Sequence, residues 1–272
     1  MDREARRLRG AHDSLRLSTE LVARHIRRTP RTAVFTGDMT STHAPEDRLR
    51  AALEHPSASA RLASALAAGT SPDPRFAPVL VEACGAEPDF FVRDMLTWAI
   101  TRHTADDTVP LLIAAASSNV QQARSQAFHT LSKVRDPRGW SAITSEVMAD
   151  RDDEVARAAW RCAVILAPDE ERQRVADWLS RELGRGDREL QRSLSRALAD
   201  LGIDAEAVLA AASASDVEVI RVHAIASQRL IDDPSEGFDA AIAEATLLVA
   251  RQDRREGPSS SDSSSVIVTA PS

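Results

Sequence analysis

An arginine recurs through the middle of the chain at a nearly constant interval, and this period constrains the fold more than any other feature. Successive copies are separated by 32, 31 and 33 residues: Arg61, Arg93, Arg124 and Arg157. Around each copy, apolar residues recur at steps of three and four, which is the pattern of an amphipathic helix. A second helix keeps step, because Pro78, Pro110 and Ser141 each lie 17 residues after their arginine. Each period therefore contains two helices joined by a short turn.

A period of this size, built from two helices, predicts an α-solenoid. One pair of amphipathic helices cannot bury its apolar face alone, so neighbouring pairs must stack. We therefore expect an all-α fold in which about six helical hairpins stack through residues 44–251. Two less regular copies of the repeat, near Arg192 and Arg221, supply the last two hairpins. Residues that can cap a helix N-terminus precede the first helices: Ser57, Asp89, Asp153 and Asp187.

Three short stretches resemble HEAT repeats, of the short variety found in bacterial proteins related to phycobilisome lyases: Asp73-Pro74, Ala77-Pro78-Val79-Leu80 and Val92-Arg93. The resemblance covers roughly residues 45–250. It implies a right-handed α-α superhelix of the HEAT/armadillo type whose second helices line the concave face. It also implies a structural role for the four repeat arginines, which in HEAT repeats contact an acidic residue of the neighbouring repeat. The resemblance implies no particular activity.

The two ends of the chain differ in composition from the repeats. Residues 1–43 read as a basic N-terminal helix followed by a linker. That helix either caps the first repeat or forms a basic arm or coiled coil for a partner, so we expect a monomer with dimerisation through the helix as the alternative. Residues 252–272 are rich in serine and poor in apolar residues, so we expect a disordered tail.

Charge and composition bear on the class of partner. Residues 1–31 hold nine arginines against four acidic residues, about +5, which leaves about −12 for the rest of a chain whose net charge is −7. A surface that binds nucleic acid should be basic, so we expect no nucleic-acid partner. No signal peptide and no apolar run long enough to span a membrane occur in the sequence. We therefore expect a cytoplasmic protein with no membrane partner.

The residue patterns that mark catalytic, cofactor or metal sites are missing from the sequence. There is no phosphate-binding Gly-rich loop, no His-Glu-x-x-His and no Gly-x-Ser-x-Gly. Cys84 and Cys162 lie in apolar helical segments of different repeats, which is typical of buried free cysteines. We therefore predict no catalytic residue, no metal ligand and no cofactor.

These patterns favour a non-catalytic scaffold that binds a protein or peptide on its concave face. Trp140 and Trp178, placed in second helices, are expected to be either core residues or partner anchors, and they are the candidate anchors because aromatic anchors dominate interface energies. One alternative is a regulatory module that acts through the basic N-terminal helix. Another is an enzyme similar to the HEAT-like alkylpurine DNA glycosylases or phycobilin lyases. Asp177-Trp178 is the nearest match to the acidic residue and tryptophan of the glycosylases.

Overall fold

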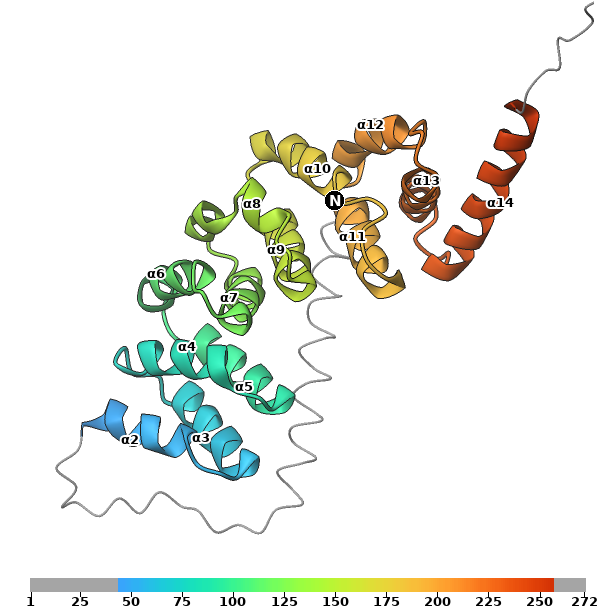
Figure 1. Ribbon diagram of the computed structural model, residues 1–272. Coiled ribbons are helices and arrows are strands. Elements are labelled where there is room, and N and C mark those ends of the chain that lie inside the picture. The colour runs from blue at the N-terminus through green and yellow to red at the C-terminus, as the bar shows by residue number, and fades with distance from the viewer. Residues whose placement is uncertain (1–43, 257–272) are drawn as a thin grey trace, which may run out of the picture. The chain divides into compact units, whose positions relative to one another are not determined.

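The computed structural model describes residues 44–256, and in this part of the chain every regular element is a helix (Figure 1). The helices are α2 (Pro45–Leu53), α3 (Ala58–Thr70), α4 (Phe76–Ala86), α5 (Phe90–Thr101), α6 (Ala105–Ala116), α7 (Gln121–Val134), η1 (Pro137–Ala142), α8 (Ser145–Met148), α9 (Asp153–Leu166), η2 (Asp169–Glu171), α10 (Arg172–Ser180), α11 (Arg188–Leu201), α12 (Ile203–Ala212), α13 (Glu218–Asp232) and α14 (Phe238–Glu256). The expectation of an all-α fold is confirmed for these residues.

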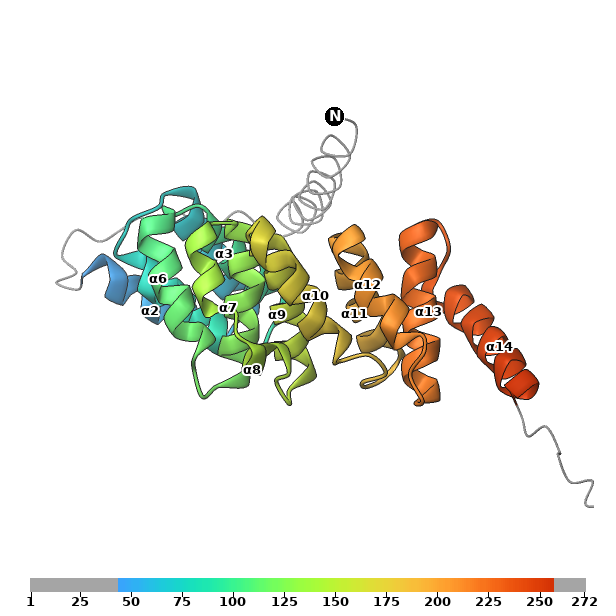
Figure 2. The same cartoon turned by 90° about the horizontal axis from the view of Figure 1, so that it is seen from above.

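The helices pack mainly against neighbours in the sequence and form two rows. The odd-numbered helices from α3 to α13 form one row, in which each helix contacts the next. The other row contains α2, α4 and α6, then η1 and α8, then α10 and α12. The last helix, α14, packs on α13. Figure 2 shows the same succession in chain order, from α2 and α3 at one end to α14 at the other.

Ion pairs repeat along the chain with the period of the sequence. Six arginines each bond to a carboxylate 32 residues away. The pairs are Arg50 with Glu82, Asp106 with Arg138, Asp153 with Arg185, Arg157 with Glu189, Arg172 with Asp204 and Arg221 with Asp253. Because a shift of 32 residues leads to the equivalent position in the next helix pair, equivalent positions of successive pairs lie side by side along the stack.

Small residues let the helices of the first row approach closely. A Cβ atom on Gly69 of α3 would lie 2.4 Å from the Trp98 ring and 2.8 Å from the Ala99 Cα of α5. In α9, Val155, Ala159 and Trp160 are buried together against the neighbouring helices. The Trp160 indole N–H donates to the Met148 carbonyl oxygen at 2.7 Å, so this large side chain is buried without an unsatisfied donor.

Helix caps follow the expected positions with two corrections. The Asp89 carboxylate accepts hydrogen bonds from the Phe91 and Val92 amides, and Asp187 caps α11 in the same way. Ser57 occupies the N-cap of α3, but its side chain makes no capping bond. The cap of α9 is Asp152 rather than Asp153, which is the first helical residue.

The prediction of a continuous second helix around Trp140 is wrong, because this stretch contains a 3-10 helix, η1, followed by the short helix α8. Asp136 caps η1, and Pro137 occupies its first turn. Gly139 packs so closely that an added Cβ would lie 2.9 Å from a Leu166 methyl carbon. Proline and glycine are the poorest helix formers, and here they produce a compact turn in place of a helix.

The first and last described helices lie close to the predicted ends of the solenoid, residues 44 and 251. The first helix, α2, begins at Pro45, and α14 continues through Glu256, beyond the predicted boundary at residue 251. The predicted basic helix within residues 1–43 and the tail from residue 257 onward lie outside the described residues. Between residues 44 and 256, no helix is both long enough and apolar enough to cross a bilayer.

Candidate binding groove

A groove of about 900 Å³ runs across α5, α7, α9 and α11, the first helices of four successive pairs. The HEAT resemblance implied that second helices line the concave face, whereas this groove is lined by first helices. Six arginines and four acidic residues line it. The arginines are Arg93, Arg157, Arg161, Arg188, Arg192 and Arg196, and the acidic residues are Asp94, Glu154, Glu189 and Asp200. The charged lining therefore carries a net charge of about +2 by count.

The arginines come from one face of each helix. Arg157 and Arg161 are four residues apart on α9, and Arg188, Arg192 and Arg196 follow the same spacing on α11. Residues four apart lie on the same side of a helix. The opposite side of α11 is apolar and buried, with leucines at 190, 194 and 198. Burial of the leucines therefore turns the arginine face of α11 toward the groove.

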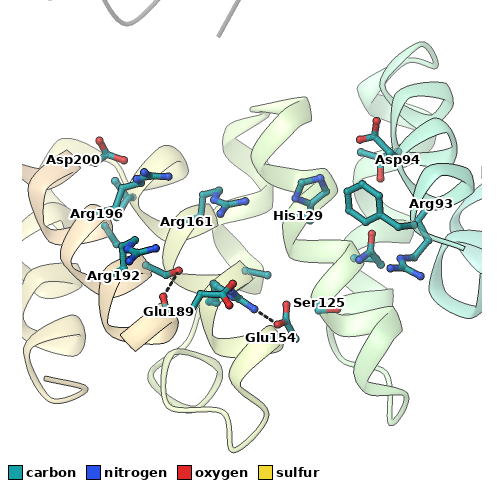
Figure 3. Close-up of a pocket in the computed structure, with 18 of the residues that line it drawn as sticks. Arg93, Asp94, Ser125, His129, Glu154, Arg161, Glu189, Arg192, Arg196 and Asp200 are labelled. Carbon is teal, nitrogen blue, oxygen red and sulfur yellow. Dashed lines mark hydrogen bonds and ion pairs between the residues drawn. The ribbon is translucent and has the colours of Figure 1, made fainter. Parts of the chain in front are cut away.

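Some of these arginines are engaged within the protein and others are not. Arg157 bonds to Glu154 of its own helix and to Glu189 of α11, and Arg192 bonds to Asp239 at 2.9 Å. The side chains of Arg161, Arg188 and Arg196 make no hydrogen bond or ion pair with any residue of the described part of the chain. Figure 3 shows Arg161 in the middle of the groove, between Arg196 on one side and His129 on the other. Three guanidinium groups of the groove thus have no hydrogen-bonding partner within residues 44–256.

Arg161 lies close to several other charged groups of the groove. Desolvation in the groove lowers the pKa of Arg161 from its ordinary value, and the positive charges of Arg196 and Arg157 lower it further, whereas the negative charge of Asp200 partly opposes this shift. Burial likewise lowers the pKa of His129 to about 4, with additional contributions from Lys133 and Arg161. At neutral pH the imidazole is therefore uncharged, whereas Arg161 keeps its charge. The centre of the groove is a site where an added anion would be stabilised.

One end of the groove carries exposed aromatic side chains. Phe90, which lines the groove, is 66% exposed, and the adjacent Phe91 is 68% exposed. The two rings pack edge to face with centroids 5.6 Å apart. The Arg93 guanidinium lies 5.9 Å from the Phe90 ring centroid, within the range of a cation–π contact. This end therefore offers apolar surface next to a positive charge.

The two tryptophans proposed as partner anchors lie outside the groove. Trp140 of η1 and Trp178 of α10 stack on each other, with ring centroids 6.4 Å apart and an angle of 21° between the planes. Arg174 lies 6.0 Å from the Trp178 ring centroid. Both indoles are half-buried on the second row, and the exposed carboxylate of Asp177 belongs to that row too. The structure thus brings the tryptophans together, but away from the groove arginines.

The repeat arginines divide into two kinds. Arg61 and Arg124 bond to carboxylates 26 residues later, Glu87 at 2.7 Å and Asp150 at 3.1 Å. Arg93 instead donates to the carbonyl oxygens of Glu87 and Pro88. Arg157 reaches Glu154 and Glu189, as described above. Arg93 and Arg157 line the groove, whereas Arg61 and Arg124 do not.

A buried polar network, not foreseen from the sequence, joins α11 to α13. The His223 Nδ1 accepts a hydrogen bond from the Gly184 amide at 2.9 Å, so its Nε2 carries the proton. Nε2 lies 3.0 Å from both the Gln191 carbonyl oxygen and the Ser195 hydroxyl, which is 2.7 Å from the Ser227 hydroxyl. Burial lowers the pKa of His223 to about 4. The His223, Ser195 and Ser227 side chains are 0% exposed, so the network holds two helices together and is closed to substrate.

Two further observations bear on the kind of site. Within residues 44–256, no cluster of three or more His, Cys, Asp or Glu side chains is placed to hold a metal ion. Cys84 and Cys162 are both buried free cysteines.

A comparison with protein-family models finds no family that matches the chain, and a comparison with curated proteins finds no match.

Proposed function

We propose that this protein is a non-catalytic scaffold of the HEAT/armadillo type, which binds a segment of a partner protein in the groove of its first helices. The recurring contacts along each row and the ion pairs at a spacing of 32 residues support a superhelical stack, and the HEAT resemblance implies that its twist is right-handed. In such a stack each helix pair contacts only its neighbours, and one surface runs along the whole array. That surface is suited to an elongated ligand.

The groove itself is the observation that carries the proposal. It crosses four helices, and packed helices lie about 8–10 Å apart, so it extends over roughly 24–30 Å. An extended peptide of about nine residues has this length, whereas a small metabolite would fill a fraction of it. Its mixture of arginines, carboxylates and an exposed phenylalanine offers the polar and apolar contacts that protein interfaces combine.

The glycosylase alternative gains no support from the groove. Neither Asp177 nor Trp178 lines it, and residues 44–256 carry 25 basic against 35 acidic side chains. A net acidic surround repels a duplex more strongly than a short peptide, because the duplex carries a negative charge about every 1.7 Å along its axis. Protein binding therefore remains the function that the geometry favours.

Affinity purification from the native host with three variants tests the proposal. The groove variant is Arg161→Gln with Arg196→Gln. The matched control is Arg102→Gln with Arg181→Gln, two exposed arginines outside the groove lining that give the same change of charge. The third variant, Trp140→Ala with Trp178→Ala, removes the aromatic pair.

We expect a partner protein to be retained by the wild type and the charge-matched control and to be lost by the groove variant. A partner that the groove variant retains and the tryptophan variant loses would place the interface on the second row and refute the assignment to the groove.

A further inference from the structure

We propose that the groove selects an acidic polypeptide segment, whose Asp and Glu side chains pair with Arg161, Arg188 and Arg196 while an apolar residue packs against Phe90. The proposal rests on the scaffold function above and specifies the chemistry of the partner.

The internal pairing of the groove charges leaves a positive strip. Glu154 and Glu189 both bond to Arg157, so these carboxylates are already engaged. Arg161, Arg188 and Arg196 have no such bond within residues 44–256. A guanidinium group matches a carboxylate with two parallel hydrogen bonds, and such charge-assisted bonds are about twice as strong as neutral ones. Asp200 attracts Arg161 electrostatically but forms no hydrogen bond with it. A ligand carboxylate can therefore supply the hydrogen-bond acceptor that these arginines lack within the described residues.

The helices that carry the arginines are held in place, although the arginines repel one another. Arg161 faces Arg196 across the groove, and each projects from a helix whose opposite side is buried in the core (Figure 3). Because α9 and α11 are fixed by that packing, the cations cannot separate by a shift of the backbone. Site residues on rigid helices are already positioned when the ligand arrives. Binding of an anion then removes a repulsion that the empty groove maintains.

The aromatic end adds an apolar contact. Phe90 is largely exposed, yet the Phe91 ring and the Arg93 guanidinium both pack against it. These contacts restrict its movement, so a leucine or aromatic residue of the ligand can pack on it at low entropic cost.

The distribution of negative charge favours a polypeptide over a nucleic acid. Asp94, Glu154, Glu189 and Asp200 face the same groove as the arginines. Duplex DNA carries a charge about every 1.7 Å along its axis and cannot avoid these carboxylates. An acidic peptide can place its charged residues opposite the arginines and uncharged residues opposite the carboxylates.

Fluorescence anisotropy with the full-length protein tests the inference. The probe is a labelled peptide of about nine residues, long enough to span the groove, rich in glutamate and with one leucine near an end. It is compared with the same peptide carrying glutamine at every glutamate position and with duplex DNA of similar length. Each probe is titrated with the wild type, the Arg161→Gln/Arg196→Gln variant and the Arg102→Gln/Arg181→Gln control. Thermal unfolding verifies that all three proteins are folded.

We expect the acidic peptide to bind the wild type with a Kd below about 1 mM. Both the glutamine peptide and the groove variant should weaken binding about tenfold, with the control within about twofold. Equal affinity for the two peptides would overturn the acidic selectivity and leave the scaffold function intact. Tighter, arginine-dependent binding of DNA would overturn both proposals. Binding of no peptide below about 1 mM would overturn the inference, and the scaffold function would then be judged by affinity purification alone.

Discussion

Replacing Arg61 with methionine should destabilise the first helix pairs strongly, because the Arg61–Glu87 pair is nearly removed from solvent. The two side chains are 13% and 5% exposed. Arg61 donates from Nε and Nη2 to the two Glu87 oxygens, each at 2.7 Å, and the Asp89 amide donates to the same carboxylate at 2.8 Å. The substitution leaves Glu87 with only the amide bond, in a place that water barely reaches.

The magnitude follows from the burial of the carboxylate. Removal of one partner from a buried ion pair costs about 3–5 kcal/mol, mostly because the other charge stays behind unpaired. Arg124 provides a graded control, since its bonds to Asp150 are 3.1 and 3.3 Å long and the two side chains are 19% and 17% exposed. Arg124→Met should therefore cost about 1–2 kcal/mol. Replacing Glu87 as well, with methionine, removes the stranded charge, so the double variant should be more stable than Arg61→Met alone.

The pH dependence gives an independent check. Burial opposes ionisation of Glu87, but the hydrogen bonds from Arg61 and the Asp89 amide outweigh it and lower the pKa below the usual range. Because the folded-state pKa is depressed, the contribution of the pair is present above the ordinary glutamate pKa of about 4.3 and is lost as the pH falls below it. The stability difference between wild type and Arg61→Met should therefore narrow below this pH.

Urea unfolding together with hydrogen exchange of α2–α5 measures these effects, because a stack of repeats can open at one end before it unfolds as a whole. At about 2–4 °C per kcal/mol for a chain of this size, Arg61→Met should lower Tm by about 6 °C or more. Equal losses for Arg61→Met and Arg124→Met, or a double variant less stable than Arg61→Met, would refute the argument from burial.

Three further predictions concern the core. Burial lowers the folded-state pKa of His223 to about 4, so the unfolded state binds more protons than the folded state as the pH falls below about 6.5. The free energy of unfolding should therefore drop by roughly 3 kcal/mol by pH 4. In thermal melts, the Tm of His223→Ala should depend less steeply on pH than that of the wild type. Gly69→Ala should cost about 1–3 kcal/mol in urea unfolding, because its Cβ would lie 2.4 Å from an indole ring on α5, whereas Gly237→Ala, with open space around it, should not destabilise the protein. Burial raises the pKa of Cys84 to about 11 and of Cys162 to about 12, so mass spectrometry should detect rapid alkylation by iodoacetamide only after denaturation.

The sequence period predicts the helix pairs well because the same period reappears as physical contacts. A stack of equivalent units brings residue i close to residue i+32, and Arg157 meets Glu189 for this reason. The prediction fails around Trp140, where local turn chemistry replaces the helix that the apolar pattern favours. An apolar pattern shows which residues are buried, but it does not show whether Pro137 and Gly139 leave room for a regular helix.

The net charge of the whole chain does not reveal the arginine-lined groove. The acidic total charge excluded a cationic surface, although Arg188, Arg192 and Arg196 already marked one face of a predicted helix. Charge on an amphipathic helix has to be assessed face by face, because burial of the apolar face leaves the other exposed. The alternation of first and second helices in the sequence does not tell which of the two rows lines the groove, since either row can do so.

One further sequence position separates the two kinds of repeat arginine. The residue 26 positions after Arg61 is Glu87, and after Arg124 it is Asp150; both arginines bond to these carboxylates. The equivalent position after Arg93 is Asn119 and after Arg157 is Leu183, neither of which carries a charge. These two arginines therefore have no acidic partner at that position, and they are the two that line the groove. This separation holds for these four copies and does not extend to the later ones. Arg192 lines the groove although Glu218 lies 26 residues after it. Arg221 has Leu247 at that position, and it bonds to Asp253 outside the groove. A carboxylate 26 residues later therefore fixes the role of Arg61 and Arg124 through direct pairing, whereas the role of each other arginine depends on which further carboxylates its helix pair brings within reach.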